Sequence, residues 1–595
     1  MAIKTQKIVA DFETTTQRDD VRAWAVCGVD IETSKTVFLD TSLGKFMDWL
    51  SNKNTVCYFH NLKFDGEFIL SWLLTNGFKL SESRETKTFD CLITDDGIFY
   101  SITVYFERQN KKYKKVTFYD SLKKLPFKVS AISKAFELED EKLVIDYDEY
   151  RPPDHQLTEQ ERQYVVNDCR IVAQALKIQF EKGLTKMTNA SDAMNGYKEI
   201  ITKKNFENWF PVLPVELDAD IRQAYKGGFV YLNPKYRNKR GLQGITLDVN
   251  SLYPSRMYYC MLPYSFPMFF EGEPVPDEHY PLFIVRLRCS FELKDGYIPT
   301  IQLKNNRAFI ETEYLTTSNN EIVELTLTNV DLELFLEHYK TYNLEYVCGW
   351  KFKGAVGMFQ KYIDYWMHIK ETTTGPYRQL AKLQLNSLYG RFAMNPKAFK
   401  KVCYLDEYGI VRYEVVKDKE TADKYGIKPP ELRDPVYTAM GCFITAESRA
   451  LTIRSAQKNF DRFIYADTDS LHLIGEELPE LEVHPTKLGA WKHEGTFVDS
   501  KYIRAKTYME TMKESKEKTD LCTYCKLLNK TFEVWREETC IIYYDTKVTC
   551  AGMPDNVKED VTYDNFRSGS TFEGKLMPRR YRGGIILEDT TFTIK

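Results

Sequence analysis

The stretch Tyr465-Ala-Asp-Thr-Asp-Ser470 places two carboxylates one residue apart between two apolar runs. Those runs, Phe463-Ile464-Tyr465 before it and Leu471-His472-Leu473 after it, predict a β-hairpin with Asp467 and Asp469 at or beside its turn. Residues two apart on an extended chain project to the same face, so the two charges are expected to lie close together. Such a pair either shares a proton or binds a divalent cation, for which Mg²⁺ is suited. A solvated acidic turn is the alternative for an isolated Asp-x-Asp.

Asp248 is a third acidic residue in a comparable setting. It lies in Ile245-Thr-Leu-Asp-Val-Asn-Ser-Leu-Tyr-Pro254, which predicts a strand running into a tight turn at Ser251–Pro254. Alone it could be a helix-capping carboxylate. Together with Asp467 and Asp469 it completes the set of oxygen donors that phosphoryl transfer by two cations about 3.5–4 Å apart requires.

A helix that begins near Gly375-Pro376 and ends at Gly390 is expected to supply cationic groups opposite these carboxylates, since proline suits a first helical turn. One face repeats polar side chains every four residues: Arg378, Lys382 and Asn386. The other face is expected to pack through Leu380, Leu383 and Leu388. A plain amphipathic helix explains the leucines but not the run from Asn386 to Gly390.

A second acidic set lies in the first 190 residues. Asp11 and Glu13 follow an apolar run and share one face of an expected strand, and Asp65 lies in Tyr58-Phe-His-Asn-Leu-Lys-Phe-Asp-Gly66. Tyr164 and Asp168 share one face of a helix expected from Thr158, with Glu161 as its capping box, to about Lys182. Each residue alone is more often structural. Together, four carboxylates and a tyrosine have the composition of a two-metal hydrolytic site.

The bulk composition limits the possible partners. At 595 residues and 43% hydrophobic content the chain predicts several domains, and its net charge of -3 means that nucleic-acid binding must depend on local positive segments. Three candidates contain tyrosines, although each can equally be ordinary solvated surface: Lys111–Lys115, Lys235–Arg240 and Arg579–Arg582.

The cysteines and the N-terminus favour a soluble protein of a reducing cytosol. The 13 cysteines are odd in number and scattered, which argues against a disulfide framework. Cys522-Thr-Tyr-Cys525 has zinc-like spacing, but Cys540 and Cys550 lack a matching pair, so a zinc site is not favoured. Neither a signal peptide nor a membrane span is expected.

The motifs, taken in order, resemble those of the family B DNA polymerases, specifically the protein-primed, phi29-like phage branch. Three segments resemble the exonuclease motifs: Asp11-Phe-Glu13, Asn61-Leu-Lys-Phe-Asp65 and Tyr164-x3-Asp168. Three more resemble polymerase motifs A, B and C: Asp248–Pro254, Lys382–Gly390 and Tyr465–Ser470. Lys506-Thr-Tyr508 resembles the Lys-x-Tyr motif, and Tyr225-Lys-Gly-Gly228 the linker motif, with Lys226 where arginine is expected.

The resemblance implies a multidomain fold of α/β and α+β type: a ribonuclease H-like 3′–5′ exonuclease domain and a right-hand polymerase with two insertions. The implied segments are the exonuclease at 1–188, the palm at 189–259 and 437–550, a first terminal-protein-region insertion at 260–357, the fingers at 358–394, a second such insertion at 395–436 and the thumb at 551–595. Segment 415–435 is charged and contains proline, so an exposed loop or insertion is expected there. Segments 395–436 and 510–545 are longer than the resemblance leads us to expect.

The resemblance also implies roles in synthesis. Asp248, Asp469 and the backbone of Val249 would bind the polymerase metals, with Asp467 beside them. Tyr253 would exclude a 2′-hydroxyl and Tyr389 would shape the base-pair pocket. The remaining implied contacts are Lys370 and Lys382 with the incoming triphosphate, and Tyr225, Gly227, Gly228, Ser251, Lys506 and Tyr508 with DNA.

For the exonuclease, Asp11, Glu13, Asp65 and Asp168 would bind metals and Tyr164 would orient water. Contacts with the frayed strand or its scissile phosphate are implied for His60, Asn61, Phe64, Ser121, Leu122 and Lys142. Two Mg²⁺ ions, or Mn²⁺, are expected in each site.

The implied function is protein-primed replication of a linear phage genome in the cytoplasm of a bacterial host, with strand displacement. The implied partners are a terminal protein in a heterodimer, template and primer DNA, dNTPs, and phage single-stranded-DNA-binding and origin-binding proteins, with no membrane. Two alternatives remain: a family B polymerase that uses only nucleic-acid primers, and a DNA-binding replication protein without catalysis. The second is disfavoured because all seven metal-binding candidates are acidic.

Overall fold

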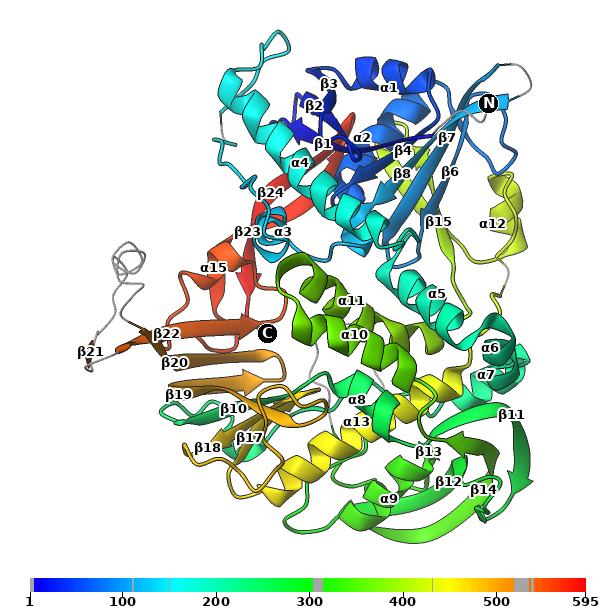
Figure 1. Cartoon of the computed structure of the whole chain (residues 1–595), viewed down its shortest axis with the longest axis vertical. Helices are drawn as coiled ribbons and strands as arrows, with labels where there is room; N and C mark the ends of the chain where they lie inside the picture. Colours follow the sequence, from blue (N-terminus) through cyan, green and yellow to red (C-terminus); the bar gives the residue numbers. More distant parts are fainter. Residues whose placement is uncertain are drawn as a thin grey trace.

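The computed structural model describes residues 5–109, 112–147, 149–302, 314–430, 432–517, 535–536 and 540–595 (Figure 1). Lys111, Cys522 and Cys525 therefore lie outside the described residues. Within the described part, no helix is both long enough and apolar enough to cross a membrane.

The N-terminal unit is an eight-stranded mixed sheet covered by helices. Its strand order is β3-β2-β1-β4-β8-β7-β6-β5, with β4 parallel to both β1 and β8. The strands are β1 (Gln6–Thr14), β2 (Ala23–Asp30), β3 (Thr36–Asp40), β4 (Thr55–Phe59), β5 (Lys79–Leu80), β6 (Thr88–Ile93), β7 (Phe99–Gln109) and β8 (Lys112–Asp120). The helices are α1 (Leu43–Ser51), α2 (Leu62–Thr75), α3 (Val129–Ala135) and α4 (Glu159–Glu181).

Helix α4 packs against β1 and β2 and carries the predicted capping box. The Thr158 hydroxyl accepts the Glu161 amide at 3.2 Å, and the Glu161 carboxylate accepts the Thr158 amide at 2.9 Å. Lys182 is the C-cap, so both predicted ends of this helix are confirmed.

A second eight-stranded sheet, in which every pairing is antiparallel, contains the stretch Tyr465–Ser470. Its order is β21-β22-β20-β19-β10-β18-β17-β9. The strands are β9 (Val230–Leu232), β10 (Gly244–Val249), β17 (Phe463–Asp467), β18 (Ser470–Ile474), β19 (Trp491–Arg504), β20 (Thr507–Glu517), β21 (Trp535–Arg536) and β22 (Cys540–Cys550). The predicted hairpin is confirmed: β17 ends at Asp467, β18 begins at Ser470, and Thr468 in the turn has a left-handed backbone with φ of 61°.

A third sheet, of order β11-β14-β12-β13, lies within residues 262–355. Its strands are β11 (Leu262–Glu271), β12 (Leu282–Leu293), β13 (Val323–Thr328) and β14 (Tyr339–Ala355), with helix α9 (Asn329–His338) beside them. Two further hairpins are β15 (Lys400–Leu405) with β16 (Val411–Val416), and β23 (Thr571–Tyr581) with β24 (Gly584–Thr593).

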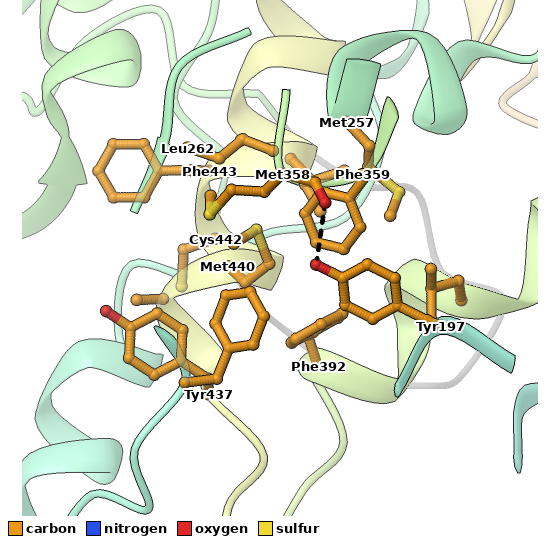
Figure 2. Packing of buried hydrophobic residues seen from close by; sticks show 14 of the residues in the cluster. Tyr197, Met257, Leu262, Met358, Phe359, Phe392, Tyr437, Met440, Cys442 and Phe443 are labelled. Carbon is orange, nitrogen blue, oxygen red and sulfur yellow. Dashed lines mark hydrogen bonds between the residues drawn. The ribbon is translucent and has the colours of Figure 1, made fainter. Parts of the chain in front are cut away.

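One large apolar core joins the third sheet to the helices around it. Those helices are α5 (Asn189–Ile201), α6 (Lys203–Trp209), α7 (Val215–Arg222), α8 (Leu252–Tyr259), α10 (Gln360–Thr372), α11 (Gly375–Phe392) and α13 (Thr438–Lys458). Figure 2 shows Tyr197 of α5 among these side chains, where its hydroxyl donates to the Met358 carbonyl at 3.3 Å. Its ring stacks on Phe359 with centroids 4.7 Å apart. This core fixes α10 and α11 against α5, α8 and α13.

Three local predictions were wrong. Ser251–Pro254 is not a turn: the left-handed Ser251 (φ 55°) makes the bend, and α8 already begins at Leu252. Helix α11 runs to Phe392, two residues past Gly390, because Phe392 is buried in the core. Leu385, rather than Leu383, is fully buried beside Leu380 and Leu388. Segment 415–435, predicted as an exposed loop or insertion, contains the end of β16 and the short helix α12 (Lys419–Lys424).

The β23–β24 hairpin reaches back to the N-terminal unit (Figure 1). It follows the short helix α15 (Asp555–Lys558). Buried Glu67 of α2 accepts hydrogen bonds from Arg580 of β23 at 2.8 Å and from the Tyr413 hydroxyl of β16 at 2.9 Å. The Arg580 guanidinium also lies over the Tyr413 ring, 4.7 Å from its centroid. Three segments distant in sequence therefore meet at one carboxylate.

Candidate active sites

The carboxylates of the central sheet come together because β18 lies between their two strands. Asp248 at the end of β10 and Asp467 at the end of β17 both pair with Ser470. Asp469 lies in the turn between β17 and β18, and its carbonyl accepts the Val249 amide at 2.8 Å. The structure thus brings together the three predicted carboxylates and the predicted backbone of Val249.

Electrostatics distinguish these carboxylates. Burial, followed by the charges of Asp469 and Glu494, raises the pKa of Asp248 to about 7, against the opposing effect of Lys492 and Lys382. Burial and the charge of Asp467 also raise the pKa of Asp469. Half-buried carboxylates that repel each other are a donor set suited to divalent cations, so these residues fit a metal site.

Cationic side chains line the opposite side, as predicted. Arg378, Lys382 and Asn386 are all exposed along one face of α11. Lys370 of α10 donates to the Ser251 hydroxyl at 2.9 Å, next to the strand that carries Asp248. Burial, then the charges of Arg378 and Lys382, lowers the pKa of Lys370. This concentration of positive charge is suited to a polyphosphate.

Tyr253 of α8 and Tyr389 of α11 form one stacked pair, with ring centroids 4.0 Å apart and planes at 23°. Both residues were predicted to contact an incoming nucleotide. Their mutual stacking fixes each ring, so they form a rigid aromatic wall between α8 and α11.

The segment Tyr225–Gly228 lies directly behind the hairpin turn. Arg449 of α13 is buried, forms an ion pair with Asp331 at 2.8 Å and donates to the carbonyls of Lys226 and Gly227, each at 2.8 Å. A β-carbon at Gly228 would lie 2.6 Å from the Thr468 hydroxyl. The absence of a side chain at Gly228 therefore allows this loop to approach the turn. No sequence pattern indicated the contribution of Arg449.

Lys506 and Tyr508 of the predicted Lys-x-Tyr motif also reach the turn. Lys506 is exposed and its side-chain nitrogen contacts Asp467, while Tyr508 is half-buried with its ring 5.2 Å from that of Tyr465. Tyr236, one of the tyrosines in the positive segment 235–240, is buried and so is not a stacking surface.

The second site lies between β1 and α4 in the N-terminal unit. Ligand oxygens of Asp11, Glu13 and Asp168 all lie within 4.8 Å of one another. Burial, then the charge of Asp168, raises the pKa of Asp11 to about 7, and burial with the charges of Asp11 and Asp168 raises that of Glu13. Buried Asp168 Oδ1 has no hydrogen-bond partner among the described residues. An unpaired buried oxygen beside two other carboxylates fits a divalent cation.

Asp65 was predicted to join this set and lies at its edge. It lines the same cavity, of about 900 Å³, but is outside the group of three, and its Oδ1 accepts the Phe12 amide at 3.2 Å. Burial and the charge of Asp11 raise its pKa.

Several of the other predicted residues line this cavity: His60, Asn61, Phe64, Lys142 and Tyr164. Lys142 contacts Asp168 at 2.5 Å and the Tyr164 hydroxyl at 3.2 Å. His60 contacts Ser121 at 3.1 Å and the Phe127 carbonyl at 2.7 Å, and burial lowers its pKa. Ser121 itself is buried and Leu122 is half-buried, and neither lines the cavity, so both stand one layer behind His60.

The sequence did not reveal two contributions to this cavity. Tyr147 lines it, with its hydroxyl against that of Tyr164. The β23–β24 hairpin supplies a further wall: Leu576, Ile586, Leu587, Glu588 and Asp589. No spacing rule connects these residues with Asp11, because they are far apart in the chain.

Comparison with known proteins gives one consistent family. The model of "DNA polymerase type B, organellar and viral" matches residues 47–152 and 144–488. The DNA polymerases of Bacillus phages PZA and phi29 are each 46% identical over 589 residues, covering 98% of this chain and 99% and 98% of theirs. The DNA polymerase of Streptococcus phage Cp-1 is 33% identical over 611 residues, with 98% of both chains covered.

Solved structures agree with the sequence comparison. Phi29 DNA polymerase complexed with primer-template DNA matches with a TM-score of 0.91 at 44% identity, covering 100% of both chains. Its ternary complex with primer-template DNA and incoming nucleotides gives 0.90 at 44% identity. These matches confirm the predicted fold class, an exonuclease unit joined to a polymerase of palm, fingers and thumb. The assigned domain boundaries stay predictions.

Proposed function

The chain belongs to the organellar and viral type B DNA polymerases, and from this membership we propose that it is a protein-primed, DNA-templated polymerase with a 3′–5′ proofreading exonuclease. Its DNA polymerase activity follows from the family and from relatives of that name covering 98% of the chain. The observation that supports two activities is the presence of two separate carboxylate clusters with raised pKa values, one facing cationic helices and one in a cavity. Phi29 polymerase, the similar protein, binds primer-template DNA and nucleotides.

For synthesis, Asp248, Asp469 and the Val249 backbone would hold two Mg²⁺ or Mn²⁺ ions, with Asp467 beside them. When bound, such ions activate the attacking 3′-hydroxyl and neutralise charge on the departing pyrophosphate. Lys370 and Lys382 would neutralise the triphosphate, and Asn386 extends the same face. Tyr253 would press on the sugar and reject a 2′-hydroxyl, while Tyr389 borders the base pair. The predicted DNA contacts are Tyr225, Gly227, Gly228, Ser251, Lys506 and Tyr508.

For proofreading, Asp11, Glu13, Asp65 and Asp168 would hold two metal ions. Tyr164 would orient the attacking water, and Lys142, 3.2 Å from its hydroxyl, would neutralise the scissile phosphate. His60, Asn61 and Phe64 would contact the frayed strand from the cavity wall. Ser121 and Leu122 would support them from behind.

The proposed partners are a terminal protein that supplies the priming hydroxyl, and phage single-stranded-DNA-binding and origin-binding proteins. The proposed place of action is the cytoplasm of the bacterial host. Strand displacement is assigned to the second insertion, which contacts the N-terminal unit through Tyr413 and Glu67.

Two assays test this proposal. Primer extension on a primed template must be lost on Asp248→Ala or Asp469→Ala; unchanged extension would exclude the assigned polymerase site and favour a protein without catalysis. Incubation with the terminal protein, Mg²⁺ and one labelled nucleotide must give a nucleotide–protein adduct. If extension occurs but no adduct forms, the enzyme uses nucleic-acid primers only.

A further inference from the structure

We propose that His472 and Glu510 are positioning residues for the polymerase site, which they support from beneath by fixing Tyr465, whose hydroxyl contacts both Asp467 and Lys506. This inference rests on the proposed polymerase function. It concerns a buried polar pair that contacts neither substrate nor any of the three carboxylates directly.

The pair lies at the centre of the sheet that carries the site. His472 is on β18, where it pairs with Thr246 of β10 on one side and with Tyr465 of β17 on the other. It therefore stands between the strands of Asp248 and Asp467. His472 is 1% exposed and Glu510 of β20 is 6% exposed.

The hydrogen bonds of this pair are short and mutually supporting. His472 Nδ1 lies 2.7 Å from Glu510 Oε1, and the Tyr502 hydroxyl donates to the same oxygen at 2.5 Å. Nδ1 is also 3.0 Å from the Tyr502 hydroxyl. Burial alone would raise the pKa of Glu510, but the charge of His472 and these hydrogen bonds outweigh it and lower the pKa. Apolar residues would fill this space at lower cost, so a buried polar pair held by these hydrogen bonds indicates a specific purpose.

Three tyrosine rings surround the imidazole of His472. Its ring centroid is 5.2 Å from that of Tyr465, 5.3 Å from that of Tyr508 and 5.8 Å from that of Tyr502, each pair being edge to face. Tyr502 and Tyr508 stack on each other at 5.3 Å. Rotation of the imidazole would therefore displace Tyr465 and Tyr508 together.

Tyr465 connects the packing around His472 to the polymerase site. Its hydroxyl donates to Asp467 Oδ2 at 3.1 Å and accepts the Lys506 amide at 2.9 Å. The Lys506 side-chain nitrogen in turn donates to both carboxylate oxygens of Asp467. Glu510, His472, Tyr465, Asp467 and Lys506 thus form one continuous chain of contacts from the sheet interior to the predicted primer-binding motif.

The test uses variants of the full chain that differ in one hydrogen bond. Asparagine places its amide nitrogen near the position of Nδ1, so His472→Asn keeps the donor to Glu510, whereas His472→Gln and Glu510→Ala remove the contact. Each variant is compared on primed template DNA at saturating Mg²⁺ for kcat and for KM of the nucleotide. Degradation of single-stranded DNA reports on the separate N-terminal site. Extension by the unmodified chain tests the proposed function itself, so its failure is distinguishable from failure of this inference.

We expect His472→Gln and Glu510→Ala to lower kcat about tenfold or more, with the nucleotide KM within about twofold and exonuclease activity unchanged, as for loss of an outer-layer partner. His472→Asn should recover most of the loss. A control for the loss of a buried ion pair is Asp192→Asn, which breaks the pair with Lys124 (2.5 Å), two residues assigned to neither site. The inference is overturned if the folded fraction of His472→Gln has normal kcat, if Asn and Gln variants lose kcat equally, or if Asp192→Asn loses as much.

Discussion

The side-chain nitrogen of Lys506 lies 2.7 Å from both carboxylate oxygens of Asp467. Asp467 thus has a cation of the protein beside it, whereas Asp248 and Asp469 have raised pKa values caused chiefly by burial. In the proposed polymerase site, this difference favours Asp248 and Asp469 as the principal metal ligands, with Asp467 connecting the site to the β19–β20 turn that carries Lys506.

Replacing Lys506 by methionine should uncouple the β19–β20 turn from Asp467. We expect Lys506→Met to reduce primer extension about 10- to 100-fold, because Asp467 loses its partner and the primer end loses a cationic contact. Degradation of single strands should be unaffected. Lys513→Met removes an exposed lysine of β20, the strand that follows Lys506; it is the matched control and should retain full extension. Equal extension by both variants would contradict the role of Lys506.

The two sites should be separable by single charge removals. Asp248→Asn should abolish extension by about 10³-fold or more while leaving exonuclease activity intact, since it removes a metal ligand at one site only. The double variant Asp11→Ala, Glu13→Ala should show the reverse. Steady-state rates of both activities on the same preparations measure this. Loss of both activities in either variant would argue against independent sites.

Mg²⁺ should stabilise the protein more at pH 8 than at pH 6. Asp11 and Asp248 have pKa values of about 7, above the ordinary value of 3.8. Without metal, the folded chain therefore binds more protons than the unfolded chain between pH 3.8 and about 7. Metal-free stability therefore falls as pH rises through this range, and metal binding to the ionised carboxylates restores it. Thermal unfolding with EDTA and with Mg²⁺ at both pH values tests this. An equal Mg²⁺ effect at both would refute it.

Gly228→Ala should impair synthesis through the turn. The added β-carbon would lie 2.6 Å from the Thr468 hydroxyl, so the turn between Asp467 and Asp469 must shift. We expect kcat to fall about tenfold or more at saturating primed template. Gly227→Ala is the steric control, because a β-carbon there meets nothing within 4 Å. Saturating template removes any effect of weaker DNA binding. The steric argument fails if the two variants have the same kcat.

Arg580→Gln should weaken the junction of the C-terminal hairpin with the N-terminal unit. Glu67 would remain buried without its cation, at a cost of about 2 kcal/mol, since Arg580 is itself one-third exposed. We expect a lower thermal midpoint and faster proteolysis of the hairpin. Arg579→Gln, an exposed neighbour, should have neither effect. A normal midpoint for Arg580→Gln would show that Tyr413 alone satisfies Glu67.

Local patterns predicted much of this architecture. The Asp467–Asp469 hairpin, the capped helix from Thr158 and the polar face of α11 follow from periodicity and capping, which act over a few residues. The start of α8 at Leu252 was missed because left-handed Ser251 is stabilised by the packing around it rather than by its own preference. Arg449, Tyr147 and the His472–Glu510 pair could not be found, because their partners are distant in sequence and only tertiary packing brings them together.

The Glu67–Arg580 contact joins residues 513 positions apart. During synthesis on the ribosome the N-terminal unit emerges first, with a carboxylate in its interior whose cation has not yet been made. Phe68 likewise lacks its packing partner Gly584 until the end of the chain is made. The two residues pack so closely that a β-carbon at Gly584 would lie 2.3 Å from the Phe68 ring. The first unit to be translated is thus completed by one of the last segments, so nascent chains that stall before residue 580 should present an unfinished domain to proteases and chaperones.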